Sequence, residues 1–541
     1  MVYYLCKSEQ PGCYELATVG GDDKLVCSLD KIKQMATEGH VIYGYDNGDI
    51  TCVYDDFDSF VESQKVFMAL SGVNSDKIEF DTDRNRIRLL DCISDVDNSE
   101  SNIPDFVSDL IIGVHETTCA FRKLYILHNL HIPEGVRRIS APSRGVLAMY
   151  PATLSLQLQE LVIPSSVKVL GDGAFQTPFN KPNNTLGNLI FKCDIDTIPM
   201  ECFENCNIHE IVWPQRVSCI DEKAFQGAVL AKEFHIPSTV TRIKKNAFTT
   251  AKGIQHLYFD GEITLHSDAF SASTVNHVHF GETYLHLKWY KQQFDGCKSL
   301  ETVEYTTHCD KVSEEMFFNC TFLRKVTNMK RVSSFEQRCF YGCSLLPEID
   351  FGWVSKIGCG AFEKSGLRHI DISFVECRDG VAEEHGVCDS AFESCERLET
   401  VKLSGHIERL GRSAFARSCK LRSANLAASH ISTVASKAFQ GCSALQEIQL
   451  PDCLRHIKDY AFAGTGLKSI VLPNYLVSIG VSAFENTPLT EVWMPRKDCD
   501  IDPLAFGLID QLDKILFHVY DGSSAMAWCI ANGARYEVIA V

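Results

Sequence analysis

One phenylalanine recurs along most of this chain at a nearly constant spacing, and this repetition restricts the fold more than any other feature. Twelve of the fourteen intervals between successive copies measure 22 to 24 residues, and the other two measure 28 and 30. A period of this length is typical of a solenoid, in which each repeat packs only against its neighbours. A chain of 541 residues is also too long for a single globular core. The recurring positions are Phe175, Phe203, Phe225, Phe248, Phe270, Phe294, Phe317, Phe340, Phe362, Phe392, Phe415, Phe439, Phe462, Phe484 and Phe506.

Between two phenylalanines the apolar residues are the same from one repeat to the next, while the polar residues differ. The stretch from Gly441 to Phe462 reads GCSALQEIQLPDCLRHIKDYAF, and the next repeat reads GTGLKSIVLPNYLVSIGVSAF. Leu-x-x-Ile-x-Leu predicts a short strand with alternate residues inward, and the Pro that follows ends its pairing because proline cannot donate a ladder hydrogen bond. The second half spaces its apolar residues at three and four, which predicts an irregular or short helical return along the outside.

These repeats resemble the BspA-like leucine-rich repeats, whose pattern is C-x-x-L-x-x-I-x-L-P-x-x-V-x-x-I-x-x-x-A-F. The resemblance covers roughly residues 120–510. It implies a leucine-rich repeat solenoid of about 15 repeats of 22–24 residues, with β-strands on the concave face and irregular or short-helical segments on the convex side. We assign residues 116–510 to this solenoid, beginning with a degenerate repeat at 130–139. The match is weaker at 189–191, where the Pro is missing, at 316–317 and at 283–294.

The two ends of the chain depart from the repeat. Residues 511–541 resemble the usual ending of the class and predict a C-terminal cap, in which Ser523 or Ser524 starts a short helix, Gly533 ends it and the last apolar run adds a strand. Residues 1–115 predict a small acidic α+β domain.

Within residues 1–115, hairpins are expected around Asn47-Gly48 and around 83–85, an amphipathic helix over 57–70, and a linker or loop over 94–105.

Charge and hydropathy exclude several classes of function. The net charge is −18, and residues 1–110 hold 22 Asp plus Glu against 9 Lys plus Arg. An acidic field repels phosphate, so we expect no nucleic-acid partner. The N-terminus lacks a signal-peptide pattern and no apolar run reaches 18 residues. We therefore expect a cytoplasmic protein without membrane insertion, with the cell surface, or secretion by an unconventional route, as the alternative.

Cysteine is frequent, and its spacing favours a structural role. Among 24 cysteines, six stand three residues after the repeated Phe, and Cys419 stands four after it. A position repeated once per turn forms a ladder, where a buried thiol can meet the backbone of a neighbouring turn. In a cytoplasmic protein these are expected to be reduced thiols, and no C-x-x-C supports zinc. The six are Cys206, Cys297, Cys320, Cys343, Cys395 and Cys442.

The sequence contains no motif that predicts catalysis. It lacks G-x-x-x-x-G-K-[ST], H-E-x-x-H and G-x-S-x-G, so we expect a protein that is not an enzyme and has no cofactor or metal. The insertion at 375–388 carries residues that could bind a metal ion. Lengthening a surface loop costs little free energy, so a longer loop without a ligand is the simpler interpretation. Its metal-capable residues are Cys377, Asp379, Glu383, Glu384, His385 and Cys388.

The variable residues on either side of each inward-facing strand residue predict the binding surface. These positions point out of the concave face, and fifteen strands about 4.8 Å apart make a surface on the order of 70 Å long. Tyr and His offer amphipathic contact area, and clustered His predicts binding that depends on pH between about 5 and 7. The alternative is that variable surface positions collected polar residues by drift. The candidate partner-binding residues are His235, His256, Tyr258, His277, His279, Glu304, Asp350, Asp371, Lys402 and Trp493.

Three functional hypotheses remain at this point. The leading one is a non-enzymatic scaffold that binds a protein partner through the concave face of the repeats. The second is an effector or enzyme whose N-terminal domain acts and whose repeats select the target. The third is a structural rod without a specific ligand. Members of the class the repeats resemble are mostly adhesion or interaction proteins at cell surfaces, which implies an adhesion role if the chain is exported.

Overall fold

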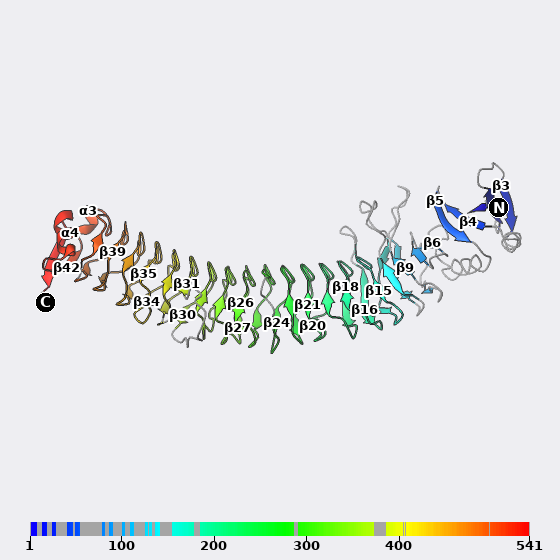
Figure 1. The fold of residues 1–541 in the computed structure, drawn as a ribbon, viewed down its shortest axis with the longest axis horizontal. Coiled ribbons are helices and arrows are strands. Elements are labelled where there is room, and N and C mark those ends of the chain that lie inside the picture. The colour runs from blue at the N-terminus through cyan, green and yellow to red at the C-terminus, as the bar shows by residue number, and fades with distance from the viewer. Residues whose placement is uncertain are drawn as a thin grey trace. The chain divides into compact units, whose positions relative to one another are not determined.

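The computed structural model describes residues 154–539 apart from 178–183, 286–289, 373–385, 404, 406 and 497 (Figure 1). Before residue 154 it describes short segments only. These are 2–7, 13–18, 24–28, 41–46, 49–54, 78–81, 86–89, 100–102, 109–112, 125–127, 129–132 and 136–140. The helix expected at 57–70 lies outside the described residues. Two compact units are present: residues 1–231 with 246–252, and residues 232–245 with 253–541.

The first unit begins with a five-stranded sheet in the order β3-β2-β1-β4-β5. Strands β4 and β5 pair antiparallel, as do β6 (Ile78–Asp81) and β7 (Arg86–Leu89), which confirms both predicted hairpins. The bounds of the first five are β1 Val2–Lys7, β2 Cys13–Thr18, β3 Lys24–Ser28, β4 Val41–Asp46 and β5 Asp49–Tyr54.

Parallel pairing of successive turns starts earlier than the sequence suggests. Strand β8 (Glu100–Asn102) pairs with β11 (Asn129–His131), and β9 (Asp109–Ile112) pairs with both β7 and β12 (Arg138–Ser140). The expected linker or loop at 94–105 therefore contains a strand, β8. Its backbone groups can pair with a neighbouring strand even though its side chains are polar. The other strands of this unit are β10 Tyr125–Leu127, β13 Leu154–Leu156, β14 Glu160–Ile163, β15 Val169–Leu170, β16 Thr185–Phe191, β17 Thr197–Ile198, β18 Asn207–Val212 and β19 Cys219–Ile220.

The second unit stacks two columns of parallel strands, and consecutive turns lie side by side (Figure 1). First-column strands up to residue 493 are the predicted Leu-x-x-Ile-x-Leu segments, and two strands of the C-terminal cap extend the column. The exposed side of these strands is called the first-column face below. Their bounds are β20 Glu233–Ile236, β22 His256–Phe259, β24 His277–His279, β25 Thr302–Glu304, β27 Lys325–Thr327, β30 His369–Ile372, β32 Thr400–Leu403, β34 Ser423–Asn425, β36 Glu447–Gln449, β38 Ser469–Val471, β40 Glu491–Trp493, β42 Leu516–Tyr520 and β43 Arg535–Ile539.

The return segments hold a second strand that sequence reasoning did not predict. Nine of these two-residue strands form one parallel sheet, from β26 to β41. Within the described part of 154–508 the return contains no helix. Second-column strands are β21 Arg242–Ile243, β23 Thr264–Leu265, β26 Lys311–Val312, β28 Ser334–Phe335, β29 Lys356–Ile357, β31 Gly386–Val387, β33 Arg409–Leu410, β35 Thr433–Val434, β37 His456–Ile457, β39 Ser478–Ile479 and β41 Asp500–Ile501.

Backbone conformation explains why the return is not helical. From Phe203 to Phe484, the residues two before and two after the repeated Phe adopt the left-handed conformation; around Phe439 they are Lys437, with φ 64°, and Gly441, with φ 74°. Two such residues within five interrupt any right-handed helix. The chain instead makes a tight turn that places Phe in the core.

Within each unit the phenylalanines form a ladder of buried rings. Successive ring centroids lie 5.1 to 5.6 Å apart in the first unit and 5.0 to 5.8 Å apart in the second. The Phe439 N–H donates to the carbonyl of Ala461 at 2.8 Å. Ala before the next Phe is small enough to let two turns approach this closely. The family pair Ala-Phe thus joins neighbouring turns by both packing and hydrogen bonding.

The cysteine ladder has the structural role that its spacing predicts. Cys442 is fully buried, and its Sγ donates to the Phe415 carbonyl at 3.1 Å. Ser418 takes the same position in the preceding turn, with Oγ 3.1 Å from the carbonyl oxygen of Phe392. Cys419 is exposed and is not a rung, because the ladder follows the third residue after Phe and not the fourth. The other rungs contact the preceding turn in the same way: Cys206, Cys297, Cys320, Cys343 and Cys395.

The C-terminal cap follows the prediction closely. Helix α3 spans Ile509–Leu512 and α4 spans Ser524–Asn532. Ser523 is the N-cap and accepts from the Met526 N–H at 3.2 Å, while Gly533 ends α4 with φ 68°. The Trp528 ring packs 5.6 Å from the last ladder ring, Phe506, which it shields from solvent.

Candidate protein-binding surface

The first-column strands alternate between core and solvent as predicted. In β20, Phe234 and Ile236 are buried while Glu233 and His235 are exposed. Because neighbouring strands pair in parallel register, equivalent residues of successive turns stand directly beside one another. Glu233 faces His256 and then His277, while His235 faces Tyr258 and then His279. The first-column face therefore displays columns of side chains that the core does not require.

Five of the predicted residues come together as a stack of rings, which we name the His–Tyr cluster: His235, His256, Tyr258, His277 and His279. The Tyr258 ring lies between two imidazoles, with centroids 4.4 Å from His235 and 4.5 Å from His279. In the adjacent column the rings of His256 and His277 are 4.4 Å apart. Stacking at these distances holds each ring flat against the next and orders an exposed surface.

Hydrogen bonds connect the cluster to a carboxylate. His279 Nδ1 lies 3.2 Å from Glu304 Oε2, and because a carboxylate only accepts, Nδ1 carries the proton. His279 Nε2 is then the acceptor for His256 Nδ1, at 3.1 Å. His277 Nδ1 lies 2.7 Å from the hydroxyl of Thr302. The Glu304 carboxylate thus sets the tautomers of two histidines across three strands.

The surroundings of the cluster also alter its titration. Burial and the neighbouring His256 lower the pKa of His277 below its usual value. Burial and a hydrogen bond to Glu233 raise the pKa of Tyr258. Both shifts favour the neutral form of the ring. Within the cluster, Tyr258 and His277 therefore favour uncharged rings at neutral pH.

The remaining predicted residues lie on the same face but outside the cluster. The Asp350 carboxylate accepts from the Gly352 N–H at 3.0 Å, within its own loop. Lys402 Nζ lies 3.9 Å from Asp371 Oδ2, and both side chains are more than half exposed. Trp493 stacks on His518, with centroids 4.5 Å apart. The structure thus joins Glu304 to the His–Tyr cluster, pairs Asp371 with Lys402, and leaves Asp350 and Trp493 as separate positions.

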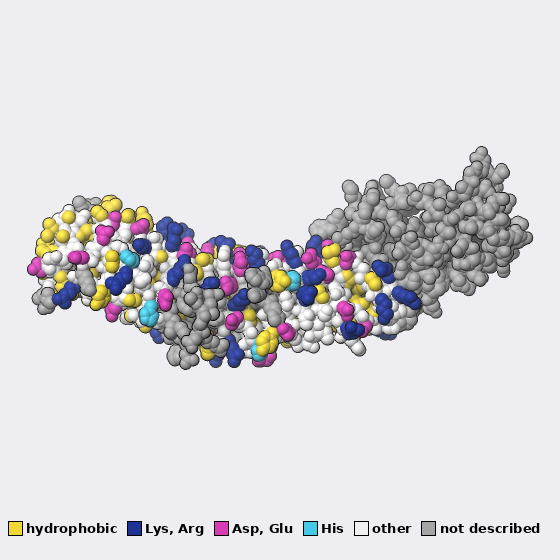
Figure 2. Space-filling view, viewed as in Figure 1, with side chains coloured by type: hydrophobic (Ala, Val, Ile, Leu, Met, Phe, Trp, Pro, Cys, Tyr) yellow, Lys and Arg dark blue, Asp and Glu magenta, His cyan; other side chains and the backbone are white. Residues whose placement is uncertain are grey.

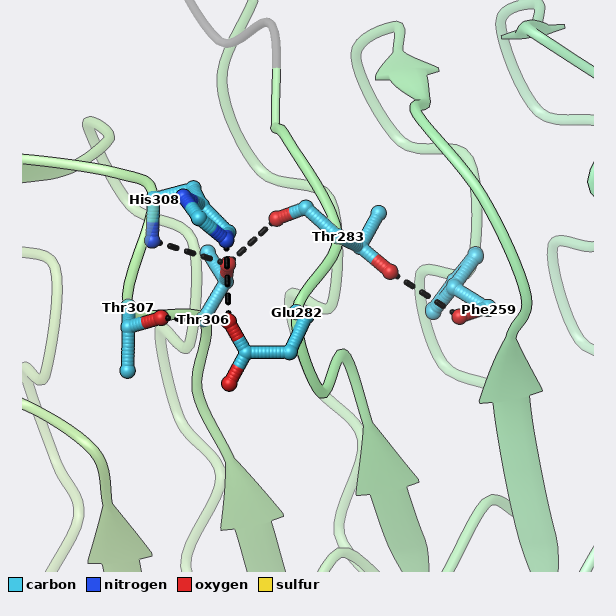
Figure 3. Close-up of polar contacts among 6 residues, drawn as sticks. All are labelled: Phe259, Glu282, Thr283, Thr306, Thr307 and His308. Carbon is cyan, nitrogen blue, oxygen red and sulfur yellow. Dashed lines mark hydrogen bonds and ion pairs between the residues drawn. The ribbon is translucent and has the colours of Figure 1, made fainter.

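A groove that sequence reasoning missed borders the cluster. It has a volume of about 380 Å³ and is lined by residues 258–262, 279–284 and 304, from β22, β24, β25 and the loops that follow. Hydrogen bonds fix these loops (Figure 3). Glu282 Oε2 lies 2.9 Å from His308 Nε2 and 3.0 Å from the Thr307 hydroxyl, and Thr283 donates to the Phe259 carbonyl at 2.9 Å.

The repeats match a known family over more than half of the chain. The family model described as "BspA type Leucine rich repeat region" matches residues 153–276, 263–377 and 386–517. The chain belongs to the BspA-type leucine-rich repeat family. Its fold is a β-solenoid of about 14 turns, which confirms the predicted fold class.

Solved BspA-type and other leucine-rich repeat proteins align with much of this chain. A leucine-rich repeat protein from Bacteroides ovatus is 20% identical, covers 75% of this chain and 92% of its own length, and has a TM-score of 0.44. A leucine rich cell surface protein from Faecalibacterium prausnitzii is 22% identical, with coverages of 58% and 86% and a TM-score of 0.31. The pneumococcal vaccine antigen PcpA is 15% identical, with coverages of 65% and 86% and a TM-score of 0.32. The search of curated proteins found no match.

The BspA-type pattern shows which signal could have revealed the groove. The pattern places Pro after the first-column strand, as at Pro237. The three repeats that line the groove have Asp260, Gly281 and Thr306 there instead, and the next five repeats also lack the Pro. Without Pro the loops are free to bring acidic and aromatic side chains beside the strand ends.

Other chemistry has little support in the described part of this BspA-type solenoid. No group of three or more His, Cys, Asp or Glu side chains there could hold a metal ion. Of the insertion's metal-capable residues only Cys388 is described, and it is buried; the others lie outside the described residues. Likewise, the described helices include none with the length and hydropathy to cross a bilayer.

Proposed function

We propose that this protein is a non-enzymatic scaffold that binds a protein partner through its first-column face, with the His–Tyr cluster at the centre of the contact. The observation that carries the proposal is the division of each repeat. Buried Leu, Ile, Phe and Cys positions build the stack, while the in-register exposed positions present ordered rings and charges. Leucine-rich repeat solenoids are typically non-enzymatic, which agrees with this division.

The composition of the cluster favours protein recognition. Tyrosine supplies a large, rigid contact area, and interface residues of this kind supply much of the binding energy in protein complexes. The stacked rings lose little side-chain entropy on binding, because Tyr258 is already held between two imidazoles. Acidic and basic side chains are interspersed over the described part of the face drawn in Figure 2.

A triple alanine variant tests the proposal. A photo-crosslinking residue at position 258 of the full chain identifies the partner, and the partner's dissociation constant is then measured for the wild type and for His256→Ala/Tyr258→Ala/His279→Ala. We expect Kd to rise at least about tenfold, because loss of a central aromatic anchor typically costs more than 1 kcal/mol.

A matched control separates surface effects from unfolding. Val477 and Tyr475 are 45% and 46% exposed and lie outside the first-column strands, so Val477→Ala/Tyr475→Ala removes apolar surface elsewhere. This variant should bind like the wild type. An unchanged Kd in the triple variant, with an unchanged melting temperature, would refute the first-column face as the contact.

The compartment of the partner is a separate question from the mode of binding. We propose a cytoplasmic partner, and the alternative is an adhesion role at the cell surface. Protease treatment of intact cells that express the full chain distinguishes the two. Resistance to cleavage supports the cytoplasmic partner, and cleavage supports the surface role.

A further inference from the structure

Two cysteines occupy neighbouring positions in consecutive turns of the second unit. Cys359 stands three residues before Phe362, and Cys388 stands four residues before Phe392. Strands β29 and β31, which end just before these cysteines, pair in parallel, and the Cys388 N–H donates to the Ile357 carbonyl at 2.9 Å. Across the fifteen repeats, cysteine occupies each of these two positions once. The sequence therefore brings two such cysteines side by side at a single place in the solenoid.

The equivalent positions of other turns show how close the two side chains come. The side chain three residues before Phe points toward the following turn: Asp389 Oδ1 accepts from the Arg412 N–H at 2.9 Å. A Cβ atom on Gly411, which stands four residues before its own Phe, would lie 2.6 Å from the same Oδ1. The Cys359 side chain is placed in the same way toward Cys388. A second example of this arrangement involves Asp459, Gly480 and Val481.

The two thiols interact directly. Both are free in the structure. Burial and the neighbouring Cys359 raise the pKa of Cys388, and the contact includes a hydrogen bond between the two thiol groups. Neighbouring strands lie about 4.8 Å apart, which falls within the roughly 4.4 to 6.8 Å that separates the Cα atoms of disulfide-bonded residues. A disulfide can therefore form here with little movement of the backbone.

The two cysteines differ in their access to solvent, which gives them different roles in oxidation. Cys359 is exposed, whereas Cys388 is only 9% exposed. An oxidant in solution therefore reaches Cys359 first. The cations Lys356 and Arg409 partly oppose the effect of burial on Cys388 and favour its thiolate, which is the form that attacks an oxidised sulfur. Cys388 is thus suited to act as the second, resolving thiol.

We propose that Cys359 and Cys388 form a reversible disulfide when the chain is exposed to hydrogen peroxide, and that this bond joins the two turns covalently. The Cys359 sulfur gives two electrons to the peroxide O–O bond, which breaks, and the products are a sulfenic acid and one water molecule. The Cys388 thiolate then attacks the Sγ of the sulfenic acid, the S–O bond breaks, and the departing hydroxide takes the proton that Cys388 gave up. Two thiols and one peroxide become one disulfide and two water molecules.

The bond would also restrain the chain between the two cysteines. This segment includes β30, which carries Asp371 on the first-column face. Closing a loop covalently disfavours the open states of the segment. Oxidation should therefore slow hydrogen exchange in peptides from residues 361–372 by at least about tenfold. The inference does not depend on the proposed function, because neither cysteine belongs to a first-column strand.

The test uses the full chain in its reduced form. Dilute protein is treated with a small excess of hydrogen peroxide, the remaining thiols are blocked with N-ethylmaleimide, and the chain is digested without a reductant for mass spectrometry. We expect a pair of peptides linked through Cys359 and Cys388, with two hydrogen atoms fewer than the separate peptides, that dithiothreitol separates again. Further oxidation of Cys359 without a linked peptide, or linkage of Cys359 to any other cysteine, would overturn the proposal. A linked peptide without slower hydrogen exchange would overturn the restraint of the segment.

Serine variants assign the two roles. Cys388→Ser keeps the size of the side chain and removes the resolving thiol, so the sulfenic acid on Cys359 should persist and its labelling by dimedone should rise at least about tenfold. Cys419→Ser removes another exposed thiol and is the matched control, which should form the same linked peptide as the wild type. Melting temperatures of the reduced proteins check that both variants fold. Equal dimedone labelling of Cys359 in the wild type and in Cys388→Ser would contradict the assigned roles and overturn the proposal.

Discussion

The phenylalanine ladder makes a prediction that depends on the repeat architecture itself. Phe439 is fully buried, and its ring lies 5.3 Å from Phe415 and 5.4 Å from Phe462. Phe439→Ala removes both ring contacts and leaves a cavity between two turns, and such truncations cost about 3–5 kcal/mol. Because each turn contacts only its neighbours, the cost should appear locally and not across the whole chain.

Hydrogen exchange with mass spectrometry measures this locality. A loss of about 3–5 kcal/mol corresponds to protection factors that fall roughly 10²- to 10⁴-fold in the turns on either side of residue 439. Peptides from residues 256–304, several turns away in the same unit, should exchange as in the wild type. Exchange is followed on the full chain under native conditions, where local openings dominate the signal.

A conservative change on the exposed face serves as the control. Val471 is 68% exposed, so Val471→Ala should alter protection about twofold at most. Two results would refute the reasoning: a loss below tenfold in the turns that flank residue 439, or an equal loss in the distant peptides. The second would mean that the second unit opens as one cooperative body and not turn by turn.

Three further predictions follow from the ladder and its charged neighbours. Cys442→Ser should melt within a few degrees of wild type, whereas Cys442→Val should lose about 0.5–1.5 kcal/mol in urea denaturation because the Phe415 carbonyl loses one of its two donors and keeps only the Ser418 N–H. Burial and the nearby Glu315 raise the pKa of Asp295 to about 6, which destabilises its charged form at higher pH. Asp295→Asn should therefore raise the melting temperature at pH 7.5, and this gain should shrink as pH falls below about 6 and vanish near the ordinary carboxyl value of 3.8. Burial raises the pKa of the Cys442 thiol to about 12, so brief iodoacetamide treatment of the native chain, read by peptide mass spectrometry, should alkylate exposed thiols and spare the rungs. Among the described residues the exposed thiols are Cys359, Cys419 and Cys453.

The cysteine positions show both the reach and the limit of sequence reasoning. The third position after Phe predicted a ladder of buried thiols, and the structure confirms six rungs. The same reasoning counted Cys419 with them, although Ser418 is the rung. The prediction for Cys419 relied on residue type and not on position within the repeat. In a solenoid the position decides, because only one place in each turn faces the carbonyl of the preceding Phe.

Sequence reasoning likewise predicted one feature of the candidate surface and missed another. The alignment on Phe placed His235, Tyr258 and His279 in one column, and strand pairing confirms that register. The hydrogen bond between His256 and His279 runs diagonally between columns, and aligning the repeat sequences does not predict it. It depends on ring rotations that are set by packing between three strands.

The sequence alone determined the solenoid, its period, the residues of each repeat that face the core, and the C-terminal cap. These features depend on patterns within one repeat and on contacts between adjacent repeats, so a periodic sequence contains the information for them directly. Only the tertiary structure decided the second column of strands, the hydrogen-bonded tautomers of the His–Tyr cluster and the acidic groove. Each of these requires backbone dihedral angles or contacts among side chains from three turns, and three loops without Pro create the groove only when they are stacked beside one another.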